Sequence, residues 1–133
     1  MSYPANYRYT KEHEWVDVQG EIAAIGITDY AQHALGDVVF VELPKVGAKV
    51  EAGKSFGSVE SVKAVSDIYA PASGEVLETN ATLHDKPETI NTDPHGGAWL
   101  IKIRPDNPGE IAKLMDVAAY QSYIAEKEKE ASA

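Results

Sequence analysis

The sequence predicts a mainly β fold, either a flattened β-barrel or a sandwich of two small sheets. Short β-prone runs follow one another closely and are separated by glycine and proline. The segments "GDVVFVE" (36–42) and "GEVLETN" (74–80) share glycine, an acid and valine in the same order, which favours two similar half-sheets packed face to face. Sustained helical periodicity begins only near residue 109, so C-terminal helices should cover an edge or an end of the sheets.

The N-terminal part is expected to form a hairpin and then a short helix. Two β-prone runs within "EWVDVQGEIAAIGI" (14–27) meet at a Gln-Gly turn. In "TDYAQHALG" the helix should cover residues 28–35, because Thr28 or Asp29 can cap its start and Gly36 can end it. The residues expected to face inward are Tyr30, Ala34 and Leu35.

Strands are expected to alternate with turns through the middle of the chain. The run 37–44 should be a strand that stops at Pro44, and several short strands should follow within residues 45–71. Residues 73–91 should contain another strand and a turn-rich loop. The run 98–105 should be a half-buried strand because its side chains alternate in character. One face would carry Trp99, Ile101 and Ile103, and the other Leu100, Lys102 and Arg104.

Two helices are expected at the C-terminal end, over residues 109–115 and 116–130. In the second helix Asp116 occupies a cap position, and apolar side chains recur at helical spacing. These apolar residues are Val117, Tyr120 and Ile124.

A single domain over residues 1–133 is expected, with its core in about 7–105 and its C-terminal helices in about 108–130. A chain of 133 residues can bury a core without disulfides or metals. The 44% hydrophobic and 25% charged content is ordinary for a globular protein. The chain has no cysteine, so any sulfur chemistry must come from an attached or bound group.

The formal net charge is −9, from 21 acidic and 12 basic residues. Such a surface repels phosphate backbones and anionic lipid, so neither nucleic acid nor membrane is an expected partner. The charge serves solubility or steers the chain toward basic patches on partner proteins. No apolar run approaches the ~18 residues of a membrane span. The first residues resemble neither a signal nor a transit peptide, which favours a cytoplasmic protein and leaves a mature mitochondrial form as an alternative.

The sequence indicates neither a catalytic residue nor a metal site. The histidines lack the spacing of metal ligands and are expected to be scattered on the surface. They are His13, His33, His84 and His95. No Gly-Xaa-Ser-Xaa-Gly elbow, phosphate-binding loop or dinucleotide fingerprint occurs, so a conventional enzyme has little support.

The stretch "VESVKAVSD" (59–67) places Lys63 between two strand-like runs, so a hairpin should hold its side chain outward. No other basic residue occurs between Lys54 and Lys86. A solubilising surface lysine is the simpler interpretation. The isolation of the amine favours a second interpretation, in which acylation removes the charge of Lys63 and turns its side chain into a tether.

The stretch around Lys63 resembles the lipoyl-attachment site of the glycine cleavage H-protein family. The similarity continues in order along most of residues 7–125. It includes "HEWV" (13–16), "GITDYAQ" (26–32), "LGDVVFVELP" (35–44), "FGSVESVKAVSDIYAP" (56–71) and "SGEV" (73–76). The resemblance implies a lipoyl/biotinyl-type fold, lipoic acid in amide linkage to Lys63, and a non-catalytic carrier whose cofactor supplies the missing sulfurs.

The resemblance also implies a set of partner enzymes. A glycine decarboxylase with pyridoxal phosphate would load the arm with an aminomethyl group, and an aminomethyltransferase would pass this group to tetrahydrofolate. A dihydrolipoamide dehydrogenase with FAD and NAD would reoxidise the dithiol. A lipoate ligase or lipoyl transferase would attach the arm in the first place.

Further site residues follow from the resemblance alone. Glu60, Gly47 and Gly74 match positions associated with recognition for lipoylation, and the glycines would permit the turn geometry that aims the hairpin. Glu14, Leu35 and Asp67 match positions that dock the loaded arm in a cleft, where water is kept from a hydrolysable group.

The chain departs from the family pattern at a few positions. His95 stands where tyrosine is common, Ala98 where glycine is usual, and Thr89 where an apolar residue is usual. Many members have a histidine directly before the leucine of the helix, whereas this chain has Ala34 there and His33 one place earlier. This change weakens the expectation of a histidine in the docking cleft.

Four alternatives remain at this stage. A lipoyl domain of a 2-oxoacid dehydrogenase would have an Asp-Lys-Ala triplet, whereas Val62 precedes Lys63 here. Biotin carriers flank their lysine with methionines, and the only methionines here are Met1 and Met115. A protein that relays lipoyl groups to other enzymes would need the same lysine. A protein–protein scaffold without a cofactor is the fourth.

Overall fold

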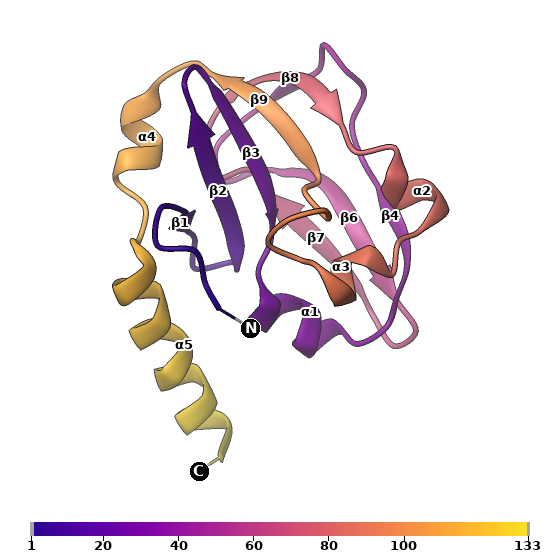
Figure 1. The fold of residues 1–133 in the computed structure, drawn as a ribbon, viewed down its shortest axis with the longest axis vertical. Coiled ribbons are helices and arrows are strands. Elements are labelled where there is room, and N and C mark those ends of the chain that lie inside the picture. Colours follow the sequence, from indigo (N-terminus) through magenta and orange to yellow (C-terminus); the bar gives the residue numbers. More distant parts are fainter. Residues whose placement is uncertain (1, 133) are drawn as a thin grey trace.

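The computed structural model describes residues 2–132 and shows two antiparallel sheets with helices at their edges (Figure 1). The strands are β1 Arg8–Tyr9, β2 Glu14–Gln19, β3 Ile22–Ile27, β4 Val38–Glu42, β5 Lys49–Val50, β6 Ser55–Ser61, β7 Val65–Tyr69, β8 Gly74–Thr79 and β9 Ile101–Pro105. The order is β1-β2-β3-β9-β8-β5 in the six-stranded sheet and β4-β6-β7 in the three-stranded sheet. The predicted sandwich of two sheets is thus confirmed. The sheets do not close into a barrel, and with six and three strands they are not the similar half-sheets that the sequence favours.

The helices are α1 Asp29–Leu35, α2 Thr82–Asp85, α3 Thr89–Thr92, α4 Pro108–Ala112 and α5 Val117–Ser132. Helices α2 and α3 lie in the segment expected to be a turn-rich loop. Each has only 4 residues, which is too short for a helical period to show in the sequence. Helix α4 ends earlier than expected, and α5 extends away from the sheets (Figure 1).

The predicted hairpin is confirmed by the pairing of β2 with β3. Their register runs from Glu14 opposite Ile27 to Gln19 opposite Ile22, so Gly20 and Glu21 form the turn. Gly20 has a φ of 65°, a conformation that glycine adopts at little cost.

Helix α1 begins and ends where the sequence predicts. The Thr28 hydroxyl accepts the amide hydrogen of Ala31 at 3.3 Å, so Thr28 is the cap and Asp29 is the first helical residue. Gly36 ends the helix with a φ of 81°. Of the residues expected to face inward, Leu35 is buried and Tyr30 half-buried, whereas Ala34 is exposed.

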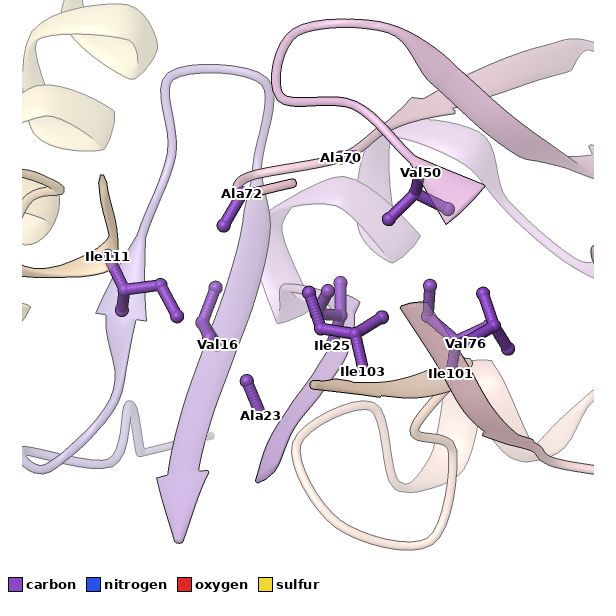
Figure 2. Close-up of a cluster of buried hydrophobic side chains, with 10 residues drawn as sticks. All are labelled: Val16, Ala23, Ile25, Val50, Ala70, Ala72, Val76, Ile101, Ile103 and Ile111. Atoms are coloured by element: carbon purple, nitrogen blue, oxygen red, sulfur yellow. The ribbon is translucent and has the colours of Figure 1, made fainter. Parts of the chain in front are cut away.

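One buried cluster lies along the inner face of the six-stranded sheet and includes Val16, Ile25, Val76 and Ile103 (Figure 2). A second cluster joins the two sheets. It contains Ile27 of β3 and Leu100, the residue directly before β9. From the smaller sheet it contains Val41, Val59 and Ile68. Leu100 was expected on the more polar face of its strand. It is buried because it precedes β9 and packs into the second cluster rather than the first.

Helix α5 is fixed to the larger sheet by a third cluster, formed by Tyr9, Trp15, Tyr120 and Ile124. The rings of Tyr9 and Tyr120 stack with centroids 4.7 Å apart. Asp116 caps the helix by accepting the amide hydrogen of Ala119 at 2.9 Å, as predicted. No helix within residues 2–132 has both the length and the apolar character that a membrane crossing needs.

Candidate functional site

Lys63 lies in the turn that joins β6 to β7, and its side chain is exposed. The buried Ser61 organises this turn. Its hydroxyl oxygen accepts the amide hydrogens of Lys63 at 3.3 Å and Ala64 at 3.1 Å, and its own amide donates to the Ala64 carbonyl at 2.8 Å. The predicted outward position of Lys63 is therefore built into an ordered turn.

The turn also contacts the end of α1. The amide of Val62 donates to the carbonyl of Asp37 at 3.0 Å. A Cβ added at Gly36 would lie 3.5 Å from the Cε atom of Lys63, so the lysine stem passes over this glycine. Lys63 thus lies beside the C-terminal end of α1.

The side chain of Asn91, in the short helix α3, connects the end of α1 to the start of β4 by hydrogen bonds. Its amide nitrogen donates to the carbonyl of Gly36 at 2.9 Å and to Oε1 of Gln32 at 3.0 Å. Its Oδ1 accepts the amide hydrogen of Val38 at 2.9 Å. The residue was not predicted as part of the site. A single asparagine in a loop has no recognisable spacing, so the sequence gives no local signal for it.

A cleft of about 160 Å³ lies between α1 and β7, beside the turn. Its lining residues are Glu12, His13, Ile27, Ala31, Ala34, Leu35, Ser66, Asp67 and Ile68. It therefore brings together Leu35 and Asp67, which are 32 positions apart in the sequence. At about 30 Å³ per water molecule, the volume corresponds to roughly five waters. A small end group fits this cleft, whereas a drug-sized ligand does not.

Glu14 does not line the cleft. It is only 2% exposed, and its Oε1 accepts the Thr10 hydroxyl hydrogen at 2.6 Å. Burial raises the pKa of Glu14 to about 7, against opposing hydrogen bonds from Thr10 and from the backbone of Tyr69. The carboxyl group is thus a buried acid that titrates near neutral pH, behind the cleft wall.

His13 lines the cleft instead. Its Nδ1 is 2.9 Å from the hydroxyl of Tyr120, and that hydroxyl is 2.7 Å from the hydroxyl of Thr28. Burial lowers the pKa of His13, and its φ of 71° is unusual for a residue other than glycine. A histidine is therefore present in the cleft, from the segment before β2 rather than from α1.

The other histidines differ in environment, so the expectation that all four lie on the surface is wrong. His33 is exposed on α1, with its Nε2 3.5 Å from a carboxylate oxygen of Asp29. His95 is buried, and its Nε2 accepts the amide hydrogen of Asp29 at 3.0 Å. Since Nδ1 of His95 lies 3.2 Å from the carbonyl of Ser2, Nδ1 carries the hydrogen and donates it.

The predicted recognition residues occupy two separate places. Glu60 is exposed on β6, next to the Lys63 turn. Gly47 lies in the β4–β5 loop with a φ of 91°, and its amide donates to Val76 of β8 at 2.8 Å. Gly74 begins β8, where an added Cβ would lie 2.4 Å from the carbonyl oxygen of Arg104. Both glycines thus contact or belong to β8 and lie outside the β6–β7 hairpin, and their part in recognition for lipoylation stays a prediction.

The arrangement can carry a covalently attached group and shelter its end. An exposed amine stands on an ordered turn, and a small cleft with an apolar wall, an acid and a histidine lies next to it. Within residues 2–132, no three His, Cys, Asp or Glu side chains come close enough together to hold a metal ion.

Comparison with known proteins agrees with this arrangement. The family model described as Glycine cleavage H-protein matches residues 7–127. The glycine cleavage system H protein of Acidobacterium capsulatum is 58% identical over 127 residues, which cover 96% of this chain and 98% of that protein. The protein of the same name from Geobacillus kaustophilus is 56% identical over 126 residues, which cover 95% of this chain and 99% of that protein.

The fold agrees as well. The crystal structure of a glycine cleavage system H protein from Mycobacterium marinum superposes with a TM-score of 0.83 at 42% identity, covering 95% of this chain and 99% of that one. The chain therefore belongs to the glycine cleavage H-protein family, which confirms the family and the shuttle role in glycine cleavage that the sequence predicts.

Proposed function

We propose that Lys63 is the residue on which this chain carries a lipoyl group, and that the chain works as a non-catalytic carrier in glycine cleavage. One observation carries the proposal. The exposed amine of Lys63 stands on a turn whose backbone is held by Ser61, next to a cleft lined by Leu35 and Asp67. A flexible arm attached there can extend to a partner enzyme or fold back into the cleft.

The residues present fit a lipoyl group. Lys63 offers a primary amine with no carboxylate within ion-pair distance in residues 2–132, so an amide can form without breaking such a pair. When attached, the group supplies disulfide–dithiol chemistry that this cysteine-free chain lacks.

The cleft residues have separate tasks in this proposal. Leu35 is nearly buried and excludes water from one wall of the cleft. Asp67 is exposed at the opposite wall, where its carboxylate can attract a cationic amine at the end of the arm. His13 offers a ring nitrogen near the cleft, and its hydrogen bond to Tyr120 fixes the ring. Glu14 is bonded to Thr10 outside the cleft lining, so this proposal gives it no direct contact with the arm.

The partners in this proposal are the enzymes that the family resemblance implies. They are a glycine decarboxylase with pyridoxal phosphate, an aminomethyltransferase with tetrahydrofolate, a dihydrolipoamide dehydrogenase with FAD and NAD, and a lipoate ligase or lipoyl transferase. The acidic surface, with a net charge of −9, favours association with basic patches on them. We place this exchange in the cytoplasm.

The intact mass of the protein from cells supplied with lipoate tests the attachment. One lipoyl adduct is expected on the parent chain and none on Lys63→Arg. Lys54→Arg is the matched control, because Lys54 is also exposed and lies at the start of the same hairpin. An unmodified parent chain, in cells with a competent ligase, contradicts the proposal.

Exchange of labelled CO₂ into glycine tests the pathway. Lipoylated protein with glycine decarboxylase should support this exchange, and Lys63→Arg should not. Loading by a 2-oxoacid dehydrogenase without glycine exchange would instead favour a lipoyl domain or lipoyl-relay protein that serves those complexes.

A further inference from the structure

The three-stranded sheet has an exposed row of side chains next to the Lys63 turn. Phe40 of β4 pairs with Glu60 of β6, and Glu60 pairs in turn with Val65 of β7. Directly opposed residues point to the same face of a sheet, so the three side chains form one row across it. Phe40 is 51% exposed and Val65 is 66% exposed. The neighbouring Val59 of β6 points to the other face and is fully buried.

The next row along the same face is polar and acidic. Glu42 pairs with Ser58, and Ser58 pairs with Asp67. None of these acids, nor Glu60, takes part in an ion pair within residues 2–132. We call the six residues of the two rows the outer face: Phe40, Glu42, Ser58, Glu60, Val65 and Asp67. It presents two apolar side chains on either side of one acid, with two further acids beside them.

Packing within the chain does not explain the apolar part of this face. The inner side chains of the same strands, Val41 and Val59, already fill the core and are at most 1% exposed. Val62, in the attachment turn, adds a third large apolar side chain at 70% exposure. Apolar side chains gathered on the surface of an acidic chain indicate a contact with another protein. The free acids complement a basic residue on that partner.

The chemistry at Lys63 indicates which partner this is. Enzymes that act on the far end of a lipoyl arm can reach it without touching the turn. The enzyme that attaches the arm works at Nζ itself. There the neutral amine attacks the carbonyl carbon of an activated lipoyl group, a C–N bond forms, and Nζ loses a proton. The bond to the leaving group, AMP or a thiol, breaks. That enzyme must therefore cover the turn and the row beside it.

We propose that the lipoyl-attaching enzyme recognises this chain through the outer face, with Phe40 as its main apolar contact and a basic residue of the enzyme opposite Glu60. This inference rests on the proposed function, because it takes Lys63 as the attachment residue. It assigns recognition to Val65, two residues after Lys63, and to Phe40, which reaches the same row only through strand pairing.

The rate of lipoylation tests the inference. Unlipoylated protein is incubated with purified lipoate ligase, lipoate and ATP, and kcat/KM is measured from the intact mass over time. Phe40→Ser should lower kcat/KM by about tenfold, chiefly through KM, as expected for the loss of a central apolar contact. Phe40→Leu should stay within about twofold of the parent chain, because it keeps an apolar side chain.

Val46→Ser is the matched control. Val46 is 63% exposed but lies in the loop between β4 and β5, outside the outer face. It should be lipoylated at the parent rate, and neither serine variant should change the thermal midpoint. A Phe40→Ser rate equal to that of the parent chain, or an equal loss in both serine variants, overturns the inference.

Two further outcomes separate the inference from the function on which it rests. Fully lipoylated Phe40→Ser, prepared by long incubation, should support glycine–CO₂ exchange at the parent rate. An exchange rate that falls as much as the lipoylation rate overturns the assignment to the attaching enzyme. A parent chain that takes up no lipoyl group would overturn the attachment at Lys63 itself.

Discussion

Aromatic residues serve opposite purposes in two regions of the molecule. At the junction of α5 with the larger sheet, Tyr9, Trp15 and Tyr120 are at most 1% exposed and pack on one another. On the outer face of the smaller sheet, Phe40 is half exposed, and no buried cluster within residues 2–132 includes it. The comparison separates a region whose aromatic side chains stabilise the fold from a region whose exposed side chain is free to contact a partner, as we propose.

The polar atoms of the junction support the same contrast. The hydroxyl of Tyr9 donates to the carbonyl of Pro4 at 2.7 Å, and Nε1 of Trp15 donates to the carbonyl of Pro94 at 2.8 Å. No buried side-chain nitrogen or oxygen in the described part of the chain is left without a partner. Substitutions at the junction should therefore change stability, and substitutions on the outer face should change recognition.

Trp15→Ala should have the largest effect on stability. The indole lies against Gly26, where an added Cβ would be 2.5 Å from the ring, so its loss leaves a cavity that the backbone cannot fill. The free energy of unfolding should fall by about 3–5 kcal/mol, measured by urea denaturation. Phe40→Ala is the matched control and should change it by less than about 0.5 kcal/mol. Equal losses in the two variants would abolish the distinction between the regions.

The elements of both regions could largely be predicted from the sequence, because their signals are local. The β2–β3 turn, which falls one position later than the predicted Gln-Gly pair, the Thr28 cap and Gly36 lie within a few residues of the elements they delimit. The unequal sheets could not be predicted, since a strand's period does not show which strand it will pair with. Lys63 needed only a hairpin and the family resemblance, whereas the outer row depends on the β4–β6–β7 register.

The burial of Glu14 had a signal that the prediction did not use. Glu14 alternates with Val16, which is buried in the core, so period-2 spacing places both on the inner face of β2. The burial of His95 had no such signal. It results from the loop after α3 folding over the start of α1, a contact between segments 66 positions apart.

Glu14 should make the folded protein less stable as the pH rises. Its pKa is raised from 4.5 to about 7, so the folded state holds a proton that the unfolded state releases between these values. The contribution of this bound proton to the free energy of unfolding is fully present below pH 4.5 and is lost by about pH 7. Relative to Glu14→Gln, the parent chain should lose on the order of 3 kcal/mol between pH 4.5 and pH 8, measured by urea denaturation. Parallel pH profiles of the two proteins would contradict the assignment.

His95 should act in the opposite direction and more weakly. Burial lowers its pKa, and in the folded state Nε2 accepts a hydrogen from Asp29, so protonation is disfavoured. Its contribution is complete above the unfolded value of 6.5 and is lost as the pH falls below it. Protonation of Nε2 leaves the buried amide of Asp29 without its acceptor, so stability should fall at acid pH.

His95→Gln provides the comparison for this titration, because its amide can accept from Asp29 and donate to Ser2 without titrating. The variant should keep its thermal midpoint between pH 7 and pH 5.5 better than the parent chain. A midpoint that falls equally in both proteins would show that another group causes the acid sensitivity.

The smallest expected effect lies in the Lys63 turn, where a polar side chain should matter more for stability than an apolar one. Ser61→Ala removes the oxygen that accepts from the amides of Lys63 and Ala64, and should lower the free energy of unfolding by about 1 kcal/mol. Val62→Ala should change it by less than about 0.5 kcal/mol, because Val62 is 70% exposed.

Hydrogen exchange at the Lys63 amide tests whether Ser61 stabilises the turn more than Val62 does. The opposite ranking would be expected if the larger apolar side chain stabilised the turn. Faster exchange in Ser61→Ala, with unchanged exchange in Val62→Ala, is expected because only the serine orders the backbone of the turn. The reverse result would mean that Val62 packs against the fold. It would then belong with the stabilising residues of the junction rather than with the exposed apolar residues beside Lys63.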